Sequence, residues 1–301
     1  MMGEQVDLAV AWDWDDDRPF LDLLASACGA LGLRMKAIGR TEAAQARRLI
    51  ESGALQIGAY LDRAAPEEET YALLSGAARS AARRVLNEPE AMRRAADKAT
   101  MHLEFLSHGI AVPYTIIISP YAHERQVGLS LEELARLGRP FIIKPANTTG
   151  GGTGVILGAE TLKDVVDQRK HLQNDKYLLQ ERVTPEELPG GRAWFRTFFV
   201  CGEIYLCWWD DRTHIYAPLE AQEARALGLE ALESITREIS RVCRLDFFSS
   251  EIARTSRRGF VVVDYVNEIC DMRLQSLHPD GVPDPTVRAI CTALASGSAV
   301  A

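Results

Sequence analysis

The sequence is short of the features that mark several large classes of protein. No apolar run approaches the roughly 18 residues that a membrane-spanning helix needs. The opening stretch MMGEQVDLAV has no basic residue ahead of its apolar segment, as a secretory signal would have. Lysine and arginine number 34 against 42 acidic residues, a net charge of −8, and no basic block stands out. We therefore expect a cytoplasmic protein that binds neither nucleic acid nor a membrane.

Several familiar catalytic and metal motifs are also missing. There is no HExxH and no GxSxG, and the six histidines are scattered, which disfavours zinc-protease and serine-hydrolase chemistry. The cysteines form no CxxC pair, so we interpret them as reduced, mostly packed thiols. They are Cys28, Cys201, Cys207, Cys243, Cys270 and Cys291.

What is present is an ordinary globular composition over 301 residues, enough for two or three subdomains. The first part alternates short apolar stretches with helical patterns, which predicts a small parallel sheet with helices on its faces. The expected strands are 6–12, 34–39 and 55–61, and the expected helices are 20–32 and 41–52.

A long helix is then expected, beginning near Asn87 and Glu90 and ending at Gly109. Lys98 lies on the flank of its apolar face, so its ammonium would point either into a cleft or into water. The face itself consists of Met92, Ala95, Ala96, Ala99, Leu103 and Leu106.

Residues 112–183 read as a compact α+β unit. Ser130 and Glu133 form a capping-box pattern at the start of a short helix, 130–138. The other expected elements are strands at 112–118, 139–144 and 177–183 and a helix over 162–172.

The remainder begins with two aromatic strands, RAWFRTFFV and IYLCWW, joined as a hairpin through Cys201, Gly202 and Glu203. Further on we expect a helix over 222–244, a strand pair at 246–253 and 260–267, and a helix over 285–295.

The stretch IIKPANTTGGGTGV (142–155) raises the main question about function. It fits neither the GxxxxGK[ST] phosphate loop nor the GxGxxG dinucleotide fingerprint, because Lys144 precedes the glycines at the end of a strand. Glycines let backbone N–H groups approach anionic oxygens without a Cβ in the way. They are Gly150, Gly151, Gly152 and Gly154.

Taken in order, the segments resemble the ATP-grasp superfamily. Their layout is similar to that of D-alanine–D-alanine ligase, glutathione synthetase and RimK-type ligases. The resemblance spans the Rossmann-like start, NEPEAMRRAADKATMHLEFLSHGIAVPYT, PFIIKPANTTGGGTGV, LLQERV, an arginine-bearing aromatic strand and a late carboxylate–asparagine pair. It implies a mixed α/β and α+β fold that clamps ATP between two α+β subdomains. The expected units are an N-terminal Rossmann-like domain with connecting helix (1–111), a small lid subdomain (112–183) and a C-terminal subdomain with the metal site (184–301).

The resemblance also implies which residues would bind ATP. Lys144 and Lys98 match lysines that contact phosphate, with Lys144 also reaching the adenine edge, and the glycine loop would cover the triphosphate. Glu181 and the backbone around Arg182 and Val183 would bind the adenine amino edge. Glu187 is the candidate for the ribose hydroxyls.

Magnesium, or manganese in its place, would be held by Glu251, Asp264 and Asn267. These supply two carboxylates and an amide oxygen, the hard ligands that Mg²⁺ prefers. The family usually has acid-x-Asn, whereas a spacing of three puts Asp264 and Asn267 on opposite faces of a regular strand unless a bulge intervenes. We therefore favour Glu251 and Asp264 over Asn267, with Glu268 and Asp271 as substitutes.

Arg196 among aromatic residues, and Arg273 after the metal segment, are the arginines that would act with Lys144 in catalysis. The implied activity is ligation of a small-molecule carboxylate to an amine through an acyl phosphate, with release of ADP and phosphate. A kinase acting on a small polyol or alcohol is the alternative. A non-catalytic nucleotide-binding module is the second, favoured only by the irregular Asp264–Asn267 spacing.

The acidic stretch WDWDDDRPF at 12–20 is left with two interpretations. Asp17 is expected to cap the helix that follows. Trp12, Asp13 and Asp15 could instead contact a substrate, since ligands bind at the carboxyl ends of strands in open α/β sheets. For Asp13 and Asp15 the sequence does not decide between the two roles. The sequence does not choose the substrates or the oligomeric state, and a homodimer is compatible with it.

Overall fold

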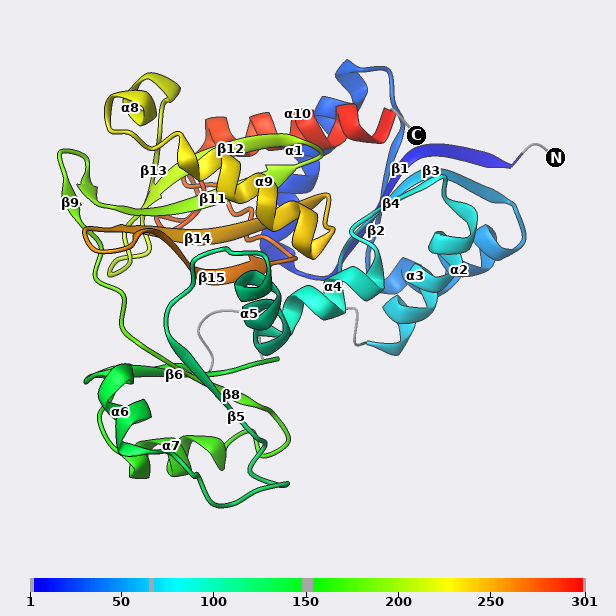
Figure 1. Cartoon of the computed structure of the whole chain (residues 1–301). Helices are drawn as coiled ribbons and strands as arrows, with labels where there is room; N and C mark the ends of the chain where they lie inside the picture. Colours follow the sequence, from blue (N-terminus) through cyan, green and yellow to red (C-terminus); the bar gives the residue numbers. More distant parts are fainter. Residues whose placement is uncertain (1–2, 65–67, 148–153, 300–301) are drawn as a thin grey trace.

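The structure, a computed structural model, describes residues 3–64, 68–147 and 154–299. Its main sheets follow one another along the chain (Figure 1), first a parallel sheet and then two antiparallel ones. Within these described ranges no helix is both long and apolar enough to cross a membrane.

The N-terminal sheet has the strand order β2-β1-β3-β4, and all its neighbouring strands are parallel. The predicted βαβαβ pattern is therefore present, and α3 with β4 extends it by one more unit. The elements are β1 (Glu4–Trp12), η1 (Asp15–Asp17), α1 (Arg18–Ala30), β2 (Met35–Ile38), α2 (Arg40–Glu51), β3 (Leu55–Arg63), α3 (Glu69–Ala81) and β4 (Arg84–Leu86).

Helices cover both faces of this sheet because alternate residues of its strands are apolar on each side. Leu8 and Val10 of β1 pack in a cluster with α1 and the C-terminal helix α10 (Asp284–Ala299). Ala9 and Ala11 pack in a cluster with α2 and α3. The last helix of the chain thus returns to the first sheet, as Figure 1 shows for α10 and α1.

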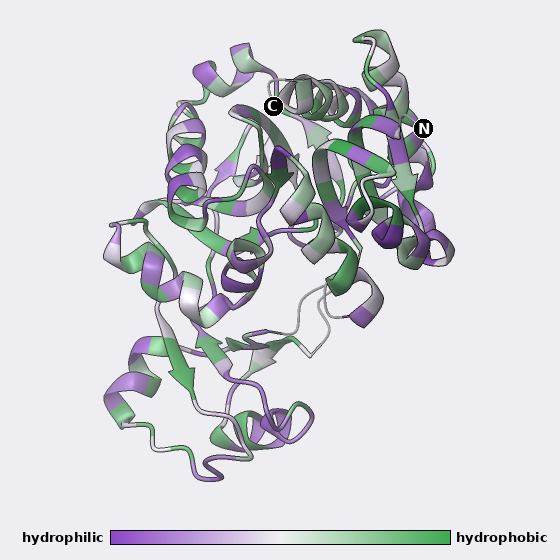
Figure 2. Ribbon diagram, turned by 90° about the vertical axis from the view of Figure 1, so that its right-hand side faces the viewer, coloured by the Kyte–Doolittle hydropathy of each residue, from purple (hydrophilic) through white to green (hydrophobic). Residues whose placement is uncertain are grey.

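The part of the chain expected as a lid, called the lid unit below, contains an antiparallel sheet of order β5-β8-β6-β7 and lies at one end of the molecule (Figure 2). Phe141 and Ile143 pack in a cluster with residues of α6 and α7, so Lys144 lies on the other face. The predicted capping box of Ser130 and Glu133 is confirmed. The elements are β5 (Thr115–Ile118), α6 (Leu131–Leu137), β6 (Phe141–Pro145), β7 (Ile156–Ala159), α7 (Leu162–Arg169) and β8 (Tyr177–Gln180).

The C-terminal sheet has the order β13-β12-β11-β14-β15 and is antiparallel throughout. The predicted aromatic hairpin is confirmed, and its turn residues Cys201 and Gly202 both have positive φ, 51° and 101°. The elements are β9 (Glu187–Leu188), β10 (Gly191–Arg192), β11 (Trp194–Val200), β12 (Glu203–Trp209), β13 (Tyr216–Pro218), α8 (Ala221–Ala226), α9 (Ala231–Cys243), β14 (Phe247–Thr255) and β15 (Gly259–Asn267).

The single helix expected over 222–244 is wrong, because the structure has two. Helix α8 ends at Ala226, and Gly228 follows with φ 65°. This left-handed conformation favours glycine and ends a helix. Leu229 and Leu232, which lie just before α9 and in its first turn, are both buried.

The long helix expected from Asn87 to Gly109 is also wrong. It is two helices, α4 (Pro89–Ala96) and α5 (Lys98–Ser107), divided at Asp97. Asp97 is extended, and its carboxylate accepts the N–H groups of Ala99 and Thr100. It thereby caps a new helix instead of continuing the old one.

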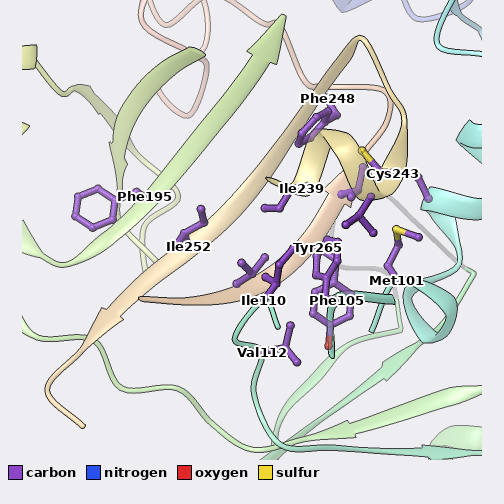
Figure 3. Close-up of a cluster of buried hydrophobic side chains, with 14 of the residues drawn as sticks. Met101, Phe105, Ile110, Val112, Phe195, Ile239, Cys243, Phe248, Ile252 and Tyr265 are labelled. Carbon is purple, nitrogen blue, oxygen red and sulfur yellow. The ribbon is translucent and has the colours of Figure 1, made fainter. Parts of the chain in front are cut away.

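This break rotates α5 relative to α4 and changes which residues are buried. Leu103 and Leu106, expected on the apolar face, are 57% and 54% exposed. Met101 and Phe105 are buried instead, in the core that α5 shares with α9, β14 and β15 (Figure 3). The connecting helices therefore pack on the C-terminal sheet.

Asn87, expected at the start of that helix, links the segment before α4 to the C-terminal sheet. Its φ is 65°, and its buried amide accepts the N–H groups of Asp246 and Phe247 while donating to the carbonyls of Phe247 and Glu268. The cysteines match expectation, since all are free and all but the half-buried Cys201 are buried.

Candidate active site

The lid sheet meets the C-terminal sheet at Lys144. Its Nζ donates to the carbonyl of Val263 at 3.2 Å, lies 4.0 Å from Asp264 Oδ1 and sits 5.0 Å from the centre of the Tyr265 ring. Lys144 is 7% exposed, and burial lowers the pKa of its ammonium against the opposing effect of Asp264. The C-terminal end of β6 thus places a desolvated cation beside β15.

Lys98 approaches the same place from α5. It is the first residue of that helix, and its backbone N–H donates to the carbonyl of Ala146 at 2.9 Å, just beyond β6. Its half-buried side chain helps to lower the pKa of both Lys144 and Asp264. The two lysines that the sequence singled out therefore both act on the charge of Asp264.

A bulge in β15 resolves the irregular spacing of Asp264 and Asn267. Ser249 pairs with Asn267 and Glu251 pairs with Asp264, so three residues on β15 span two on β14. The extra residue returns both side chains to one side, and Asn267 Nδ2 donates to Asp264 Oδ2 at 3.1 Å. Asn267 was ranked below Glu251 and Asp264 as a metal ligand because a regular strand would put it on the opposite face from Asp264. The bulge removes that objection.

Glu251 completes this group from the neighbouring strand. It lies opposite Asp264 in the register and is 9% exposed. Trp194 Nε1 donates to its Oε2 at 3.2 Å. Burial raises the pKa of Glu251, Arg196 opposes this effect, and the charge of Asp264 adds to it.

Asp264 has the opposite shift. Burial alone would raise its pKa, but the cations Lys98, Lys144 and Arg196 outweigh burial and hold the pKa below its ordinary value. One carboxylate of the pair is therefore held ionised while its neighbour is pushed toward protonation, an arrangement that a bound cation would relieve.

The donor set fits a magnesium ion rather than a zinc site. Two carboxylates and an amide oxygen are hard oxygen ligands, and Mg²⁺ usually takes one or two carboxylates plus water and phosphate. Among the residues that the structure describes, no cluster of three or more His, Cys, Asp or Glu side chains could hold a metal. A magnesium ion held by the three residues would take water or phosphate oxygens at its other positions.

Arg196 lies next to Glu251 on the adjacent strand. Its Nη1 is 2.9 Å from Glu251 Oε1, its Nε donates to the hydroxyl of Tyr216 at 3.2 Å, and its Cζ lies 5.5 Å from the Trp209 ring. Nη1 makes no well-directed hydrogen bond although it is buried. The guanidinium therefore lies between aromatic and acidic neighbours, beside the carboxylate pair.

The linker from the lid to the C-terminal sheet carries the residues expected at adenine. The Glu181 carboxylate bonds to Tyr114 and Arg258, which leaves the backbone of 181–183 as the group able to read a base edge. Glu187 is on β9, its side chain is 70% exposed, and its carboxylate lies 3.3 Å from Arg192.

Arg273 is paired rather than free. Its guanidinium donates to both Asp271 and Asp280, at 2.7 and 2.9 Å from Nη2, and lies 5.6 Å from the Trp14 ring. Asp271, named as a substitute metal ligand, is engaged in this pair. Glu268 is half-buried, and burial raises its pKa.

The acidic stretch after β1 behaves differently from the capping expectation. Asp17 makes no capping bond. Instead it is buried in an ion pair with Arg63, whose Nη2 also donates to the carbonyl of Cys270. Asp13 pairs with Arg40, which lowers its pKa, and Asp15 is exposed in η1. Asp17 pairs with Arg63 of β3 instead of capping the helix because the buried guanidinium needs a counter-charge.

Of the glycine loop, only Gly154 falls within the described residues; Gly150, Gly151 and Gly152 lie outside them. Gly154 has φ 74°, and its carbonyl accepts a hydrogen bond from Gln168 Nε2 at 2.7 Å. A side chain there would be strained.

A buried polar network beneath Lys144 had no signal in the sequence. Gln180 Nε2 donates to the Tyr265 hydroxyl at 3.0 Å, and that hydroxyl lies 2.7 Å from His102 Nδ1. In the neutral His102 tautomer that carries its proton on Nε2, the hydroxyl donates its own proton to Nδ1. No local motif marks the network, because 163 residues separate His102 from Tyr265.

His102 gives the site a pH-dependent stability. Burial, assisted by Lys144, lowers its pKa from 6.5 to about 4, so the unfolded chain takes up a proton at a higher pH than the folded chain. The contribution of neutral His102 is complete above pH 6.5 and is lost as the pH falls toward 4, in total on the order of 3 kcal/mol.

Denaturant unfolding of wild type and His102→Asn at pH 7.5, 6 and 5 tests this expectation. Asparagine keeps an acceptor for Tyr265 but does not titrate, so the variant should show a smaller loss of stability on acidification. Parallel pH profiles for the two proteins would contradict the assignment.

No family model matches this chain, and no curated protein matches it significantly. Solved structures do. A RimK domain ATP-grasp protein from Sphaerobacter thermophilus is 19% identical, with a TM-score of 0.66 over 96% of this chain and 98% of its own. D-alanine–D-alanine ligase from Bacillus anthracis, solved with ATP, is 14% identical with a TM-score of 0.65 over 99% and 98%.

The ATP-grasp ligase PsnB, solved with precursor peptide PsnA2 and AMPPNP, is 13% identical with a TM-score of 0.64 over 99% of both chains. The same ligase has also been solved with a minimal precursor, Mg and ADP. Likenesses of this extent show the fold, and the fold class expected from the sequence is confirmed.

Proposed function

We propose that this chain, which has the ATP-grasp fold, is an ATP- and magnesium-dependent ligase that joins a carboxylate to an amine. The observation that carries the proposal is the meeting of Lys144 and Lys98 with Asp264, Asn267 and Glu251 between the lid and C-terminal sheets. Cations for phosphate and oxygen ligands for a metal lie together there. Solved structures of the same fold with ATP, or with Mg and ADP, support this assignment.

In this proposal the substrate carboxylate attacks the γ-phosphate, which releases ADP and leaves an acyl phosphate. The amine then attacks the acyl carbon, phosphate departs, and the amine loses a proton. Lys144, Lys98 and Arg196 would hold the charge of the transferring phosphoryl group. Glu251, Asp264 and Asn267 would hold Mg²⁺, which neutralises phosphate charge when bound. No protein nucleophile is needed, and Arg273 would act on the acceptor side.

The structure bears on one of the two alternatives. The non-catalytic module was favoured only by the Asp264–Asn267 spacing, and the bulge in β15 accounts for that spacing. A kinase for a small alcohol would use the same nucleotide site, so the products must separate the two.

The test is an ATP turnover assay with panels of carboxylates, amines and polyols, with hydroxylamine as a trap. A ligase will give hydroxamate from an acyl phosphate when carboxylate, ATP and hydroxylamine are present, and free phosphate when an amine is supplied. A stable phosphorylated alcohol would identify the kinase instead. ATP binding without turnover across the panels would identify the module.

A further inference from the structure

The linker 181–186, which leaves the lid sheet, is fastened at its first residue. Glu181 donates its N–H to the Tyr114 carbonyl at 2.9 Å, and its Oε1 accepts the Tyr114 N–H at 2.6 Å. Arg258 Nη2 lies 2.6 Å from the same oxygen. The two chain segments that enter and leave the lid are thus tied to the turn between β14 and β15.

The linker is fastened again at its last residue, to the hairpin of β14 and β15 that carries Arg258. Glu186 donates its N–H to the Arg254 carbonyl at 2.9 Å, and its carboxylate lies 3.0 Å from Arg254 Nε. Arg254 is further held by the Leu227 carbonyl at 2.7 Å. Both ends of the linker therefore rest on arginines of one hairpin, which also carries Glu251 and Asp264.

Between these ends the linker presents its backbone. Val183 is buried in a cluster with Ala253, Val261 and Val263 of the hairpin, so one side of the linker is fixed against the sheet. Arg182 is exposed. Within the described part of the chain, the N–H groups of Arg182 and Val183 donate to no acceptor.

The backbone of Arg258 is held by hydrogen bonds within the turn between β14 and β15. Its N–H donates to Thr255 Oγ1 at 3.2 Å, and Thr255 Oγ1 donates to the Gly259 carbonyl at 3.2 Å. Gly259 has φ 67°, which closes the turn. The neighbouring Arg257 is exposed and makes no ion pair with a described residue, so it provides a matched control.

We propose that Arg258 is a positioning residue for adenine recognition and acts through Glu181, with Arg254 and Glu186 as the second fastening. The inference rests on the proposed function, since it needs ATP in this site. The arginines would hold the linker so that the backbone of 181–183 meets the donor and acceptor of the adenine edge. Arg258 itself would not touch the nucleotide. The side chains of Arg258 and Glu181 are 42% and 24% exposed, so water screens their ion pair and we expect an effect of moderate size.

The test compares the dissociation constants of ATP and inosine triphosphate for wild type, Arg258→Gln and Arg257→Gln. Inosine triphosphate keeps the phosphates and ribose but has oxygen in place of the adenine amino group. Wild type should prefer ATP, and Arg258→Gln should lower that preference by about 5- to 10-fold, mostly by weakening ATP. Arg257→Gln should behave as wild type.

A second variant keeps the test independent of folding. Glu181→Gln retains an acceptor for Tyr114 but removes the charge, so it should reproduce the effect of Arg258→Gln, and the double variant should be no worse. Equal weakening of both nucleotides, additive effects, or an unchanged preference would overturn the inference. Equal binding of both nucleotides by wild type would overturn it while leaving the proposed function intact. Absence of nucleotide binding by wild type would overturn both.

Discussion

Replacing Lys144 by alanine is expected to lower kcat/KM for ATP on the order of 100- to 1,000-fold. The ammonium is buried, lies 4.0 Å from Asp264 Oδ1 and faces the lysine of α5. A cation in such a desolvated place interacts far more strongly with phosphate than one in water. The measurement is steady-state ADP formation with the substrates found in the turnover assay, accompanied by calorimetry of ATP binding.

The matched control is Lys163→Ala in the same lid unit. Lys163 has an 83% exposed side chain and pairs with Asp167 one helical turn away, so its loss should leave kcat/KM within about 2-fold. Thermal unfolding of both variants separates loss of function from loss of fold. If Lys144→Ala turns over ATP as fast as the control while remaining folded, Lys144 has no role in catalysis.

Removing one carboxylate from the metal group should have an effect of similar size. Asp264→Asn is expected to reduce magnesium-dependent turnover on the order of 100-fold or more and to raise the Mg²⁺ concentration needed for half activity. Asp264 is held ionised by the surrounding cations, and the amide cannot replace its charge. Asn267→Ala should cost about 10-fold, because it removes a neutral ligand and one hydrogen bond to Asp264.

Magnesium titrations of ATP turnover, with calorimetry of ATP in the presence and absence of Mg²⁺, check both variants. Asp22→Asn, an exposed change on α1, is the control and should match wild type. A larger effect from Asn267→Ala than from Asp264→Asn would show that the amide, not the carboxylate, is the main ligand. Unchanged magnesium dependence in Asp264→Asn would remove Asp264 from the metal site.

The elements set by local pattern were predicted well. The capping box at Ser130 and the hairpin turn at Cys201 and Gly202 are properties of a few neighbouring residues. Such signals need no knowledge of the rest of the molecule.

The misjudged elements have one kind of cause. The helical spacing of apolar residues continues through Asp97 and through Gly228, but the helix is interrupted at both places. At Asp97 a side chain caps a new helix, and at Gly228 a left-handed residue ends the old one. In the same way, Asp17 had the position of a cap but is drawn into a buried pair with Arg63 on another strand.

The sequence by itself determined the fold class and most of the order of the elements, and it indicated the residues from which a nucleotide and metal site would be made. Whether those residues meet was decided by tertiary structure. The bulge that returns Asn267 to Asp264 depends on pairing with β14, and the link from Gln180 through Tyr265 to His102 joins three distant elements. The pairing of Arg258 with Glu181 likewise spans two units of the fold. Local patterns follow from the chemistry of adjacent residues, whereas register, ion pairing and burial depend on partners that only folding brings near.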